Sequence, residues 1–213
     1  PRRYYQTLFN LFEAEALFRK RYFDKLHIMI GPWYQTYSAS ASRNSNNVLG
    51  KASQVGLDPD DVFRKKTYAG FKAGLLLDNR NREFFPTRGI QWKHELTLGS
   101  RISSGEGKYM AYTHDMSVYA SLREPAKLVA VIKFGGGRIF SKNFEYYQAM
   151  SFGTQTDLPG FRKNRFAGKS SMYGGLELRM QLFDLNSYIM PGPFGISAFY
   201  NAGKIWQPGD RSG

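Results

Sequence analysis

The sequence predicts an all-β fold, an antiparallel transmembrane β-barrel of which eight strands are present. Segments of about ten residues alternate apolar and polar side chains, the period of a strand with one face in lipid and one in water. Short and long connections alternate between these segments, as in a meander with short periplasmic turns and longer outer loops. Aromatic residues gather near the predicted strand ends, where interfacial girdles lie, although the same residues could also pack a large β-core.

The strands follow one another along the chain. They are expected at 2–18, 25–39, 67–77, 90–100, 109–122, 127–137, 172–183 and 194–206. The first is ambiguous, because the run LFNLFEAEALF also has the spacing of a short amphipathic helix, and we favour the strand. The pattern is clearest in 172–183, where Leu176 and Leu178 alternate with Glu177 and Arg179.

The connections contain residues typical of turns and loops. We expect a short basic turn at 19–24, a long polar loop at 38–66 and a compact turn at 78–89 shaped by Pro86 and Gly89. Later connections follow at 103–108 (SSGEGK), at REPA and at a turn with Pro191 and Pro193. The longest connection precedes the strand at 172–183.

Composition limits the classes of function. The chain has 213 residues, with 30 Lys and Arg against 17 Asp and Glu, and a net charge of +13. The basic residues are scattered between apolar runs, which favours a polyanionic membrane surface over nucleic acid. No run approaches the roughly 18 apolar residues of a spanning helix, and the alternating strands of a barrel leave mean hydropathy negative, as it is here. The chain has no cysteine, which excludes disulfides and thiolate metal sites.

No catalytic constellation is evident, and we expect no enzyme activity and no cofactor. The three histidines His27, His94 and His114 lack metal-ligand spacing, and Asp115 points to the opposite strand face from His114. No serine lies in a G-x-S-x-G elbow. The segment 135–138, GGGR, lacks the Lys-Ser/Thr of a phosphate loop.

Four short motifs occur in a fixed order. They are D-N-R-x-x-x-x-F-P-T-R-G at 78–89, G-F-R-x-x-R-F-x-G at 160–168, L-E-L-R at 176–179 and F-x-N-x-G at 199–203. With this order and spacing, residues 66–206 resemble the C-terminal barrel of the BamA/TamA outer-membrane assembly superfamily, also called the bacterial surface antigen family. The resemblance implies a Gram-negative outer-membrane location and a sixteen-stranded barrel, in which these strands match the sixth to the thirteenth. The chain 1–213 is then one partial barrel domain, and Pro1 an internal start.

The resemblance also implies a long loop, 141–170, that folds into the barrel lumen. In the family its tip carries an Arg that pairs with an Asp on the thirteenth strand. Here Pro159 stands in place of that Arg and Asn201 in place of that Asp. We read the double change as linked, with Phe161 as an apolar anchor and Arg162 or Arg165 reaching Glu177. The alternative is drift in a barrel that no longer needs this latch.

Three groups of candidate site residues follow from the resemblance. The loop-tip motif comprises Leu158, Pro159, Gly160, Phe161, Arg162, Arg165, Phe166 and Gly168. The lumen partners are Glu177, Arg179, Phe199, Asn201 and Gly203. The periplasmic turn motif comprises Asp78, Asn79, Arg80, Phe85, Pro86 and Gly89.

The function implied is non-enzymatic insertion or export of proteins at the outer membrane. Expected partners are outer-membrane lipid, lipopolysaccharide, nascent outer-membrane proteins and accessory assembly subunits. One alternative is a barrel that anchors or exports an N-terminal hydrolase domain of the metallophosphoesterase or patatin-like kind, which the FFPTRG and RKNRFAG spellings suggest. Another is a soluble β-sandwich that binds an anionic ligand.

Overall fold

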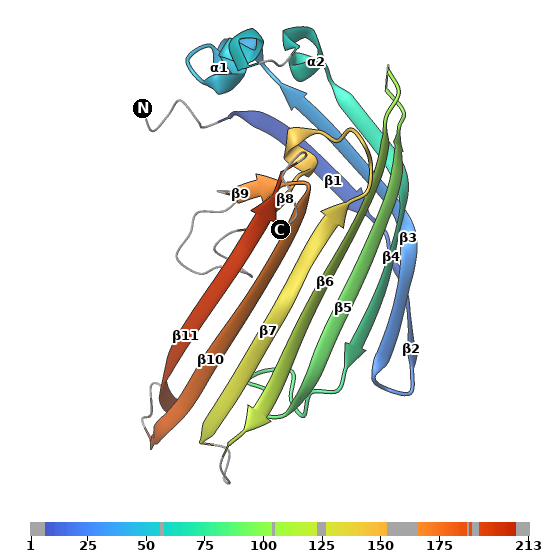
Figure 1. Ribbon diagram of the computed structural model, residues 1–213. Coiled ribbons are helices and arrows are strands. Elements are labelled where there is room, and N and C mark those ends of the chain that lie inside the picture. Colours follow the sequence, from blue (N-terminus) through green and yellow to red (C-terminus); the bar gives the residue numbers. More distant parts are fainter. Residues whose placement is uncertain are drawn as a thin grey trace.

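One curved antiparallel sheet forms most of the molecule (Figure 1). The computed structural model describes residues 7–55, 58–103, 105–122, 127–152, 166–186, 188 and 192–207. The strands of the main sheet are β1 (Phe9–Glu15), β2 (Phe18–Tyr22), β3 (Leu26–Ala39), β4 (Lys66–Asp78), β5 (Gly89–Arg101), β6 (Lys108–Ser121), β7 (Leu128–Ile139), β10 (Ser170–Leu185) and β11 (Gly192–Trp206). The predicted all-β antiparallel fold is therefore confirmed.

The sheet is eight strands wide, because β1 and β2 lie end to end along β3. Its order is β1-β3-β4-β5-β6-β7-β10-β11, with β2 paired to β3. The interruption faces Pro32, whose carbonyl accepts the Ala16 N–H at 3.2 Å but which has no N–H to donate back. The register is the same on both sides, since Glu15 pairs with Trp33 and Phe18 with Ile30. One long strand is thus divided by a single missing hydrogen bond.

The two faces of the sheet differ in chemistry, which the period-2 pattern predicts. The convex face exposes apolar side chains such as Leu176 (48% exposed) and Ile132 (53%). The concave face curves around a small second sheet of β8 (Met150–Phe152) and β9 (Phe166–Gly168) (Figure 1). No second sheet packs on the convex face in the described part of the chain, so the soluble sandwich is wrong.

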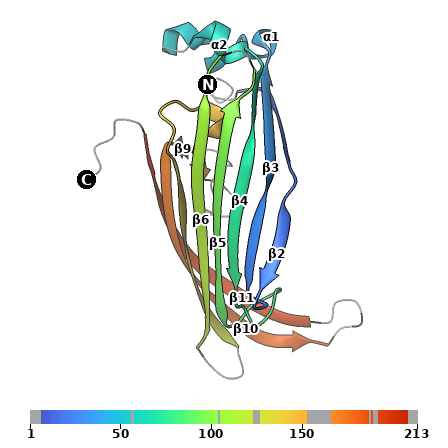
Figure 2. The ribbon, with the colours of Figure 1, turned by 90° about the vertical axis from the view of Figure 1, so that its right-hand side faces the viewer.

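Three short helices cap one end of β3 and β4. They are α1 (Ala41–Asn44), η1 (Val48–Val55) and α2 (Pro59–Phe63), and Figure 2 shows them at the end opposite the β2–β3 turn. Leu49, Ala52 and Val62 form their small apolar core. Asp58 caps α2 by accepting the Asp60 N–H, and Pro59 suits the first turn of a helix. A fourth short helix, η2 (Tyr146–Gln148), precedes β8.

The structure corrects several boundaries. The helix alternative for 2–18 is wrong over Phe9–Glu15, which is strand β1. The basic turn expected at 19–24 is also wrong, because most of it is strand β2 and the turn occupies only 23–25. The expected polar loop at 38–66 carries helices instead of irregular chain. Short and long connections were expected to alternate, but the connection at 102–107, expected to be the longer, is shorter than the turn at 79–88. Among the connections expected to be long, only those at 40–65 and 140–169 are longer than their neighbours.

No helix among the described residues has the length and apolar character needed to cross a membrane.

Candidate functional site

The centre of the concave face carries an ion network. Glu177 and Arg179 lie two residues apart on β10, so both side chains point to this face. Arg179 Nε donates to Glu177 Oε1 at 2.8 Å and Nη2 donates to Oε2 at 3.1 Å. Lys133 Nζ, from β7, lies 3.4 Å from Glu177 Oε2. The carboxylate thus faces two cations, and the excess positive charge remains on the concave side.

The expected lumen partners on β11 lie opposite this network. Phe199 pairs with Glu177, Asn201 with Gly175 and Gly203 with Tyr173. The Asn201 side chain lies directly over Gly175, where a Cβ atom would meet its Oδ1. The absence of a side chain at Gly175 therefore leaves room for Asn201 in this position.

The turn motif at 78–89 is organised by two polar side chains. Arg80 donates to both carboxylate oxygens of Asp78, through Nε at 2.8 Å and Nη2 at 2.7 Å. Asn81 Oδ1 accepts the N–H groups of Thr87 and Arg88, each at 3.1 Å, which closes the base of the turn.

The tip of this turn has an unusual backbone. Phe85 has φ of 49° and is 83% exposed, while Pro86 beside it is buried. Gly89 has φ of 114° and approaches the Asn79 carbonyl too closely for a Cβ atom. The motif is thus a rigid turn that presents aromatic side chains at its tip.

Tyr119 connects the turn to the ion network. The Arg179 guanidinium lies 5.9 Å from the centre of the Tyr119 ring, and the Tyr119 hydroxyl also interacts with Arg80. Two motifs that are far apart in the sequence therefore meet on one face. The sequence analysis missed Tyr119. Its side chain could have been assigned to the concave face, because it lies two and four residues after Ser117 and Asp115 on the same strand, β6.

The segment 144–152 folds onto the concave face from the opposite end of the sheet. Met150 packs with Ala111 and Ile139. Gln148 donates through Nε2 to Gln35 Oε1 at 3.2 Å, and its carbonyl accepts the Tyr109 hydroxyl at 3.4 Å. These contacts place the described beginning of the 141–170 loop inside the curve of the sheet.

A buried lysine fixes this segment. Lys66, the first residue of β4, is 2% exposed, and its Nζ lies 2.6 Å from both Asp61 Oδ2 and Glu145 Oε2. Asp61 belongs to α2 and Glu145 caps η2, so the lysine joins two loops. Burial by itself would raise the pKa of the Asp61 carboxyl, but the hydrogen bond and charge of Lys66, with Arg101, hold that pKa below its usual value.

An aromatic cluster lies beside the lysine, since Tyr37 pairs with Lys66 across β3 and β4. The Tyr37 and Tyr147 rings stack with centroids 4.3 Å apart and an interplanar angle of 5°. The Tyr37 and Tyr146 hydroxyls lie 2.6 Å apart. Burial raises the pKa of Tyr146 and of Tyr147, so both hydroxyls remain neutral at physiological pH. The Tyr147 hydroxyl is buried without a hydrogen-bond partner among the described residues. Sequence reasoning missed this cluster and Lys66, which it placed at the end of a polar loop.

Six of the eight loop-tip residues lie outside the described residues. They are Leu158, Pro159, Gly160, Phe161, Arg162 and Arg165. Phe166 and Gly168 lie on β9, and Gly168 packs against Ile205 and the backbone of Trp206 at the end of β11. The suggested contact of Arg162 or Arg165 with Glu177 therefore stays a prediction.

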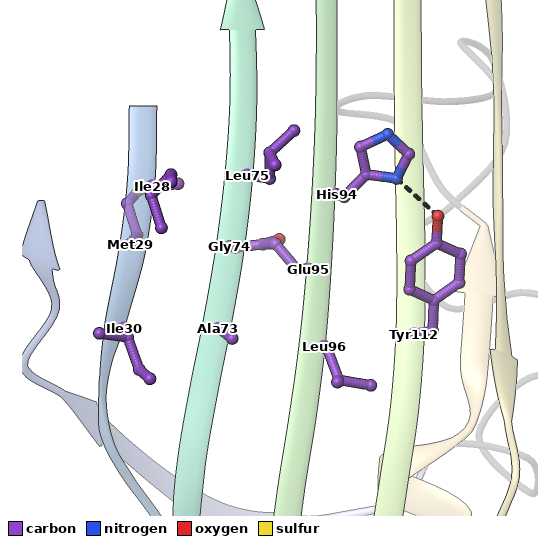
Figure 3. A pocket seen from close by; sticks show the side chains of 10 residues that line it. All are labelled: Ile28, Met29, Ile30, Ala73, Gly74, Leu75, His94, Glu95, Leu96 and Tyr112. Atoms are coloured by element: carbon purple, nitrogen blue, oxygen red, sulfur yellow. Dashed lines mark hydrogen bonds between the residues drawn. The ribbon is translucent and has the colours of Figure 1, made fainter. Parts of the chain in front are cut away.

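The structure places the three histidines on three different strands. The described residues contain no group of three or more His, Asp or Glu side chains placed to hold an ion. His94 lies on the convex face, where its Nδ1 is 2.5 Å from the Tyr112 hydroxyl beside a shallow apolar groove of about 300 Å³ (Figure 3). His114 shares that face, while Asp115 accepts the Tyr173 hydroxyl on the concave side.

A polar cavity of about 340 Å³ lies beneath the folded segment. Glu13, Trp33, Lys72 and Glu95 line it, together with residues 147–151. Trp33 Nε1 donates to Glu13 Oε1 at 2.5 Å, and Lys72 pairs with Glu15. The cavity combines charged and aromatic walls, which is typical of a solvated interior and not of a closed apolar core.

Comparison with known proteins gives two findings. The model of the Omp85 superfamily domain matches residues 24–213. Among solved structures, the chain is similar to the crystal structure of BamA from Haemophilus ducreyi lacking POTRA domains 1–3, with a TM-score of 0.67 and 18% sequence identity. That alignment covers 93% of this chain and 42% of the BamA chain, so this chain spans less than half the length of that protein.

Proposed function

Because the chain belongs to the Omp85 superfamily, we propose that it supplies part of an outer-membrane barrel that inserts or translocates other proteins. It is a protein of the bacterial outer membrane. We propose that the work is done without covalent chemistry, through the shape of the barrel wall and its polar interior.

The difference between the two faces carries this proposal. Apolar side chains cover the convex face, as at Leu176, Leu178 and Ile132, which suits contact with hydrocarbon. The concave face instead carries the Glu177, Arg179 and Lys133 network, which requires water or further polar partners. The sheet thus separates lipid from a polar interior.

The outermost strands also support the proposal. In the described part of the chain, β11 pairs only with β10, and β1 and β2 pair only with β3. Their outer backbone groups cannot remain unpaired in hydrocarbon. We propose that further strands close the barrel, as the expected sixteen-stranded arrangement requires.

The folded segment at 144–152 packs against the concave face, where Met150 contacts Ala111 and Ile139. We propose that the loop that contains it occupies the lumen, with Phe161 as anchor and Arg162 or Arg165 adding a third cation to Glu177. If so, Glu177→Ala will increase protease cleavage near Lys163. An unchanged cleavage rate would exclude that contact.

The proposed partners follow from the same surfaces. Nascent outer-membrane proteins and accessory assembly subunits are the polypeptide partners, while phospholipid and lipopolysaccharide surround the convex face. The net charge of +13 favours the anionic head groups of these lipids.

An assembly assay tests the proposal. The full-length protein is reconstituted in liposomes, a urea-denatured reporter barrel protein is added, and the folded fraction is followed by its altered mobility on unheated gels. We expect folding several times faster than in liposomes that contain an unrelated barrel of similar size. Equal rates would refute the assembly function, and equal rates with phosphoester or lipid-ester hydrolysis would favour the hydrolase-anchor alternative.

A further inference from the structure

The hairpin that joins β2 and β3 is basic, aromatic and exposed. Its sequence from Phe18 to Lys25 is FRKRYFDK, with four cations and one carboxylate. Phe18 is 77% exposed and Phe23, at the tip, is 90% exposed. This arrangement places large apolar groups next to charges in solvent, which a free surface does not favour.

The backbone at the tip is strained. Phe23 and Asp24 have φ of 50° and 56°, a left-handed conformation that turns of this kind usually fill with Asn and Gly. A bulky aromatic residue in this region is an outlier, and such outliers gather at sites that bind something. Phe85, at the tip of the neighbouring turn, is the other aromatic residue with positive φ among the described residues.

Two of the four cations form neither an ion pair nor a side-chain hydrogen bond within the described residues. Arg21 lies 3.6 Å from Asp24, and Arg19 donates to His27 Nδ1 at 3.0 Å. Lys20 and Lys25 are exposed and form no ion pair within the described residues. Lys20 lies 5.1 Å from the centre of the Tyr22 ring, so the lysine extends along an aromatic surface.

The hairpin continues the apolar convex face. Phe18, Lys20 and Tyr22 alternate on β2 and pair with Ile30, Ile28 and Leu26 on β3. Ile30 is 57% exposed on the same surface. By contrast, Asp78, which pairs with Arg80 at the start of the next turn, lies on the concave face that also carries Tyr119.

We propose that this hairpin binds the head groups of anionic phospholipid in the periplasmic leaflet. Short turns of outer-membrane barrels face the periplasm, where the leaflet consists of phospholipid. Phe18, Tyr22 and Phe23 enter the boundary between head groups and acyl chains, and Lys20 and Lys25 pair with the phosphates. In this arrangement the strained tip directs Phe23 towards that boundary. The proposal rests on the outer-membrane location and is independent of the assembly activity.

Photocrosslinking tests the proposal in the full-length protein. Phe23 is replaced by benzoylphenylalanine, which keeps an aromatic group at the tip, and the protein is placed in nanodiscs with equal amounts of phosphatidylglycerol and phosphatidylcholine. Each lysine near the membrane surface favours the anionic lipid over the neutral lipid by roughly five-fold. The two lysines together therefore give a ratio of phosphatidylglycerol to phosphatidylcholine adducts of about 30.

Two matched controls accompany the measurement. Lys20→Gln with Lys25→Gln will lower the adduct ratio to about one. Arg82→Gln with Arg88→Gln removes the same charge from the neighbouring turn and will leave the ratio unchanged. Mobility on unheated gels verifies that each variant is folded.

The contrary outcomes are distinct. Equal adducts with both lipids, or an equal loss of preference in the two double variants, would overturn the proposal. In native membranes, adducts to a polypeptide in place of phospholipid would also overturn it and would identify the hairpin as a protein contact.

Discussion

The Lys66→Met variant tests whether the buried lysine holds the segment 144–152 inside the curve of the sheet. Methionine keeps most of the side-chain volume but removes the charge that Asp61 and Glu145 share at 2.6 Å each. Two carboxylates then face one another without the cation between them. We expect the segment to detach from the concave face while the strands remain intact.

The free-energy cost of removing the lysine depends on how exposed Asp61 and Glu145 are. Removing one partner of a fully buried ion pair costs about 3–5 kcal/mol. Asp61 is 42% exposed and Glu145 is 17% exposed, so water and Arg101 compensate part of the lost charge. We therefore expect the lower end, about 3 kcal/mol, which corresponds to a roughly 150-fold larger detached population.

Hydrogen exchange measures this population. The Gln148 and Ala149 amides donate to Glu145 and Tyr146 carbonyls in η2, so their protection reports on the docked segment. In Lys66→Met the protection of both amides will fall by about 150-fold. Lys65→Met, which alters the exposed neighbouring lysine, will leave the protection unchanged.

A second substitution isolates the electrostatic cause. In the Lys66→Met background, Glu145→Gln removes one unpaired charge and will restore part of the protection. If Lys66→Met changes protection by less than about two-fold, or Lys65→Met has an equal effect, the lysine does not hold the segment. A further loss in the double variant would show that packing, and not charge, is responsible.

Three further predictions use other contacts. The pKa of Asp61 is lower in the folded protein than in the unfolded chain, so its ion pair with Lys66 stabilises the docked segment fully above the unfolded pKa and no longer does so once the pH falls through the folded pKa. Exchange protection of the η2 amides, corrected for intrinsic exchange rates, will therefore decline below about pH 4. Gly70→Ala would place a Cβ atom against the Leu98 carbonyl of the neighbouring strand and will destabilise the barrel by about 1–3 kcal/mol, seen as earlier loss of fast gel mobility on heating, whereas Gly175→Ala, whose Cβ meets only the movable end of the Asn201 side chain, will leave that mobility nearly unchanged. Asp78→Asn weakens the ion pair that shapes its turn and will increase trypsin cleavage there severalfold; an unchanged rate would show that Asn81 alone shapes the turn.

The alternation of side chains was enough to predict the strands of the main sheet, because lipid on one face and polar groups on the other impose a period of two on every strand. The pattern failed where chemistry does not alternate. The run at 19–22 is nearly all basic, so it was predicted as a turn, whereas its pairing with β3 makes it strand β2. Pairing partners are not visible in a single segment.

Contacts between distant loops were less predictable than strands. Lys66 was expected at the end of a polar loop, yet it lies under η2 because Glu145, from a loop far along the chain, reaches it. The same limit applies to Tyr119, which meets Arg80 and Arg179 only after the sheet has curved. Local pattern gives the face of a residue, while curvature decides which residues on that face meet.

Curvature also explains why the polar contacts fall into two separate groups. The Lys66 cluster lies at the end that carries the helices, and the Tyr119 link lies at the end that carries the short turns. Between them, Glu177 binds Arg179 on its own strand and Lys133 on the neighbouring β7, so no described ion pair joins one group to the other. Releasing the folded segment at Lys66 should therefore leave the turn motif intact. If Lys66→Met also exposed the turn at 79–88 to trypsin, the two ends would be coupled through the wall of the sheet itself.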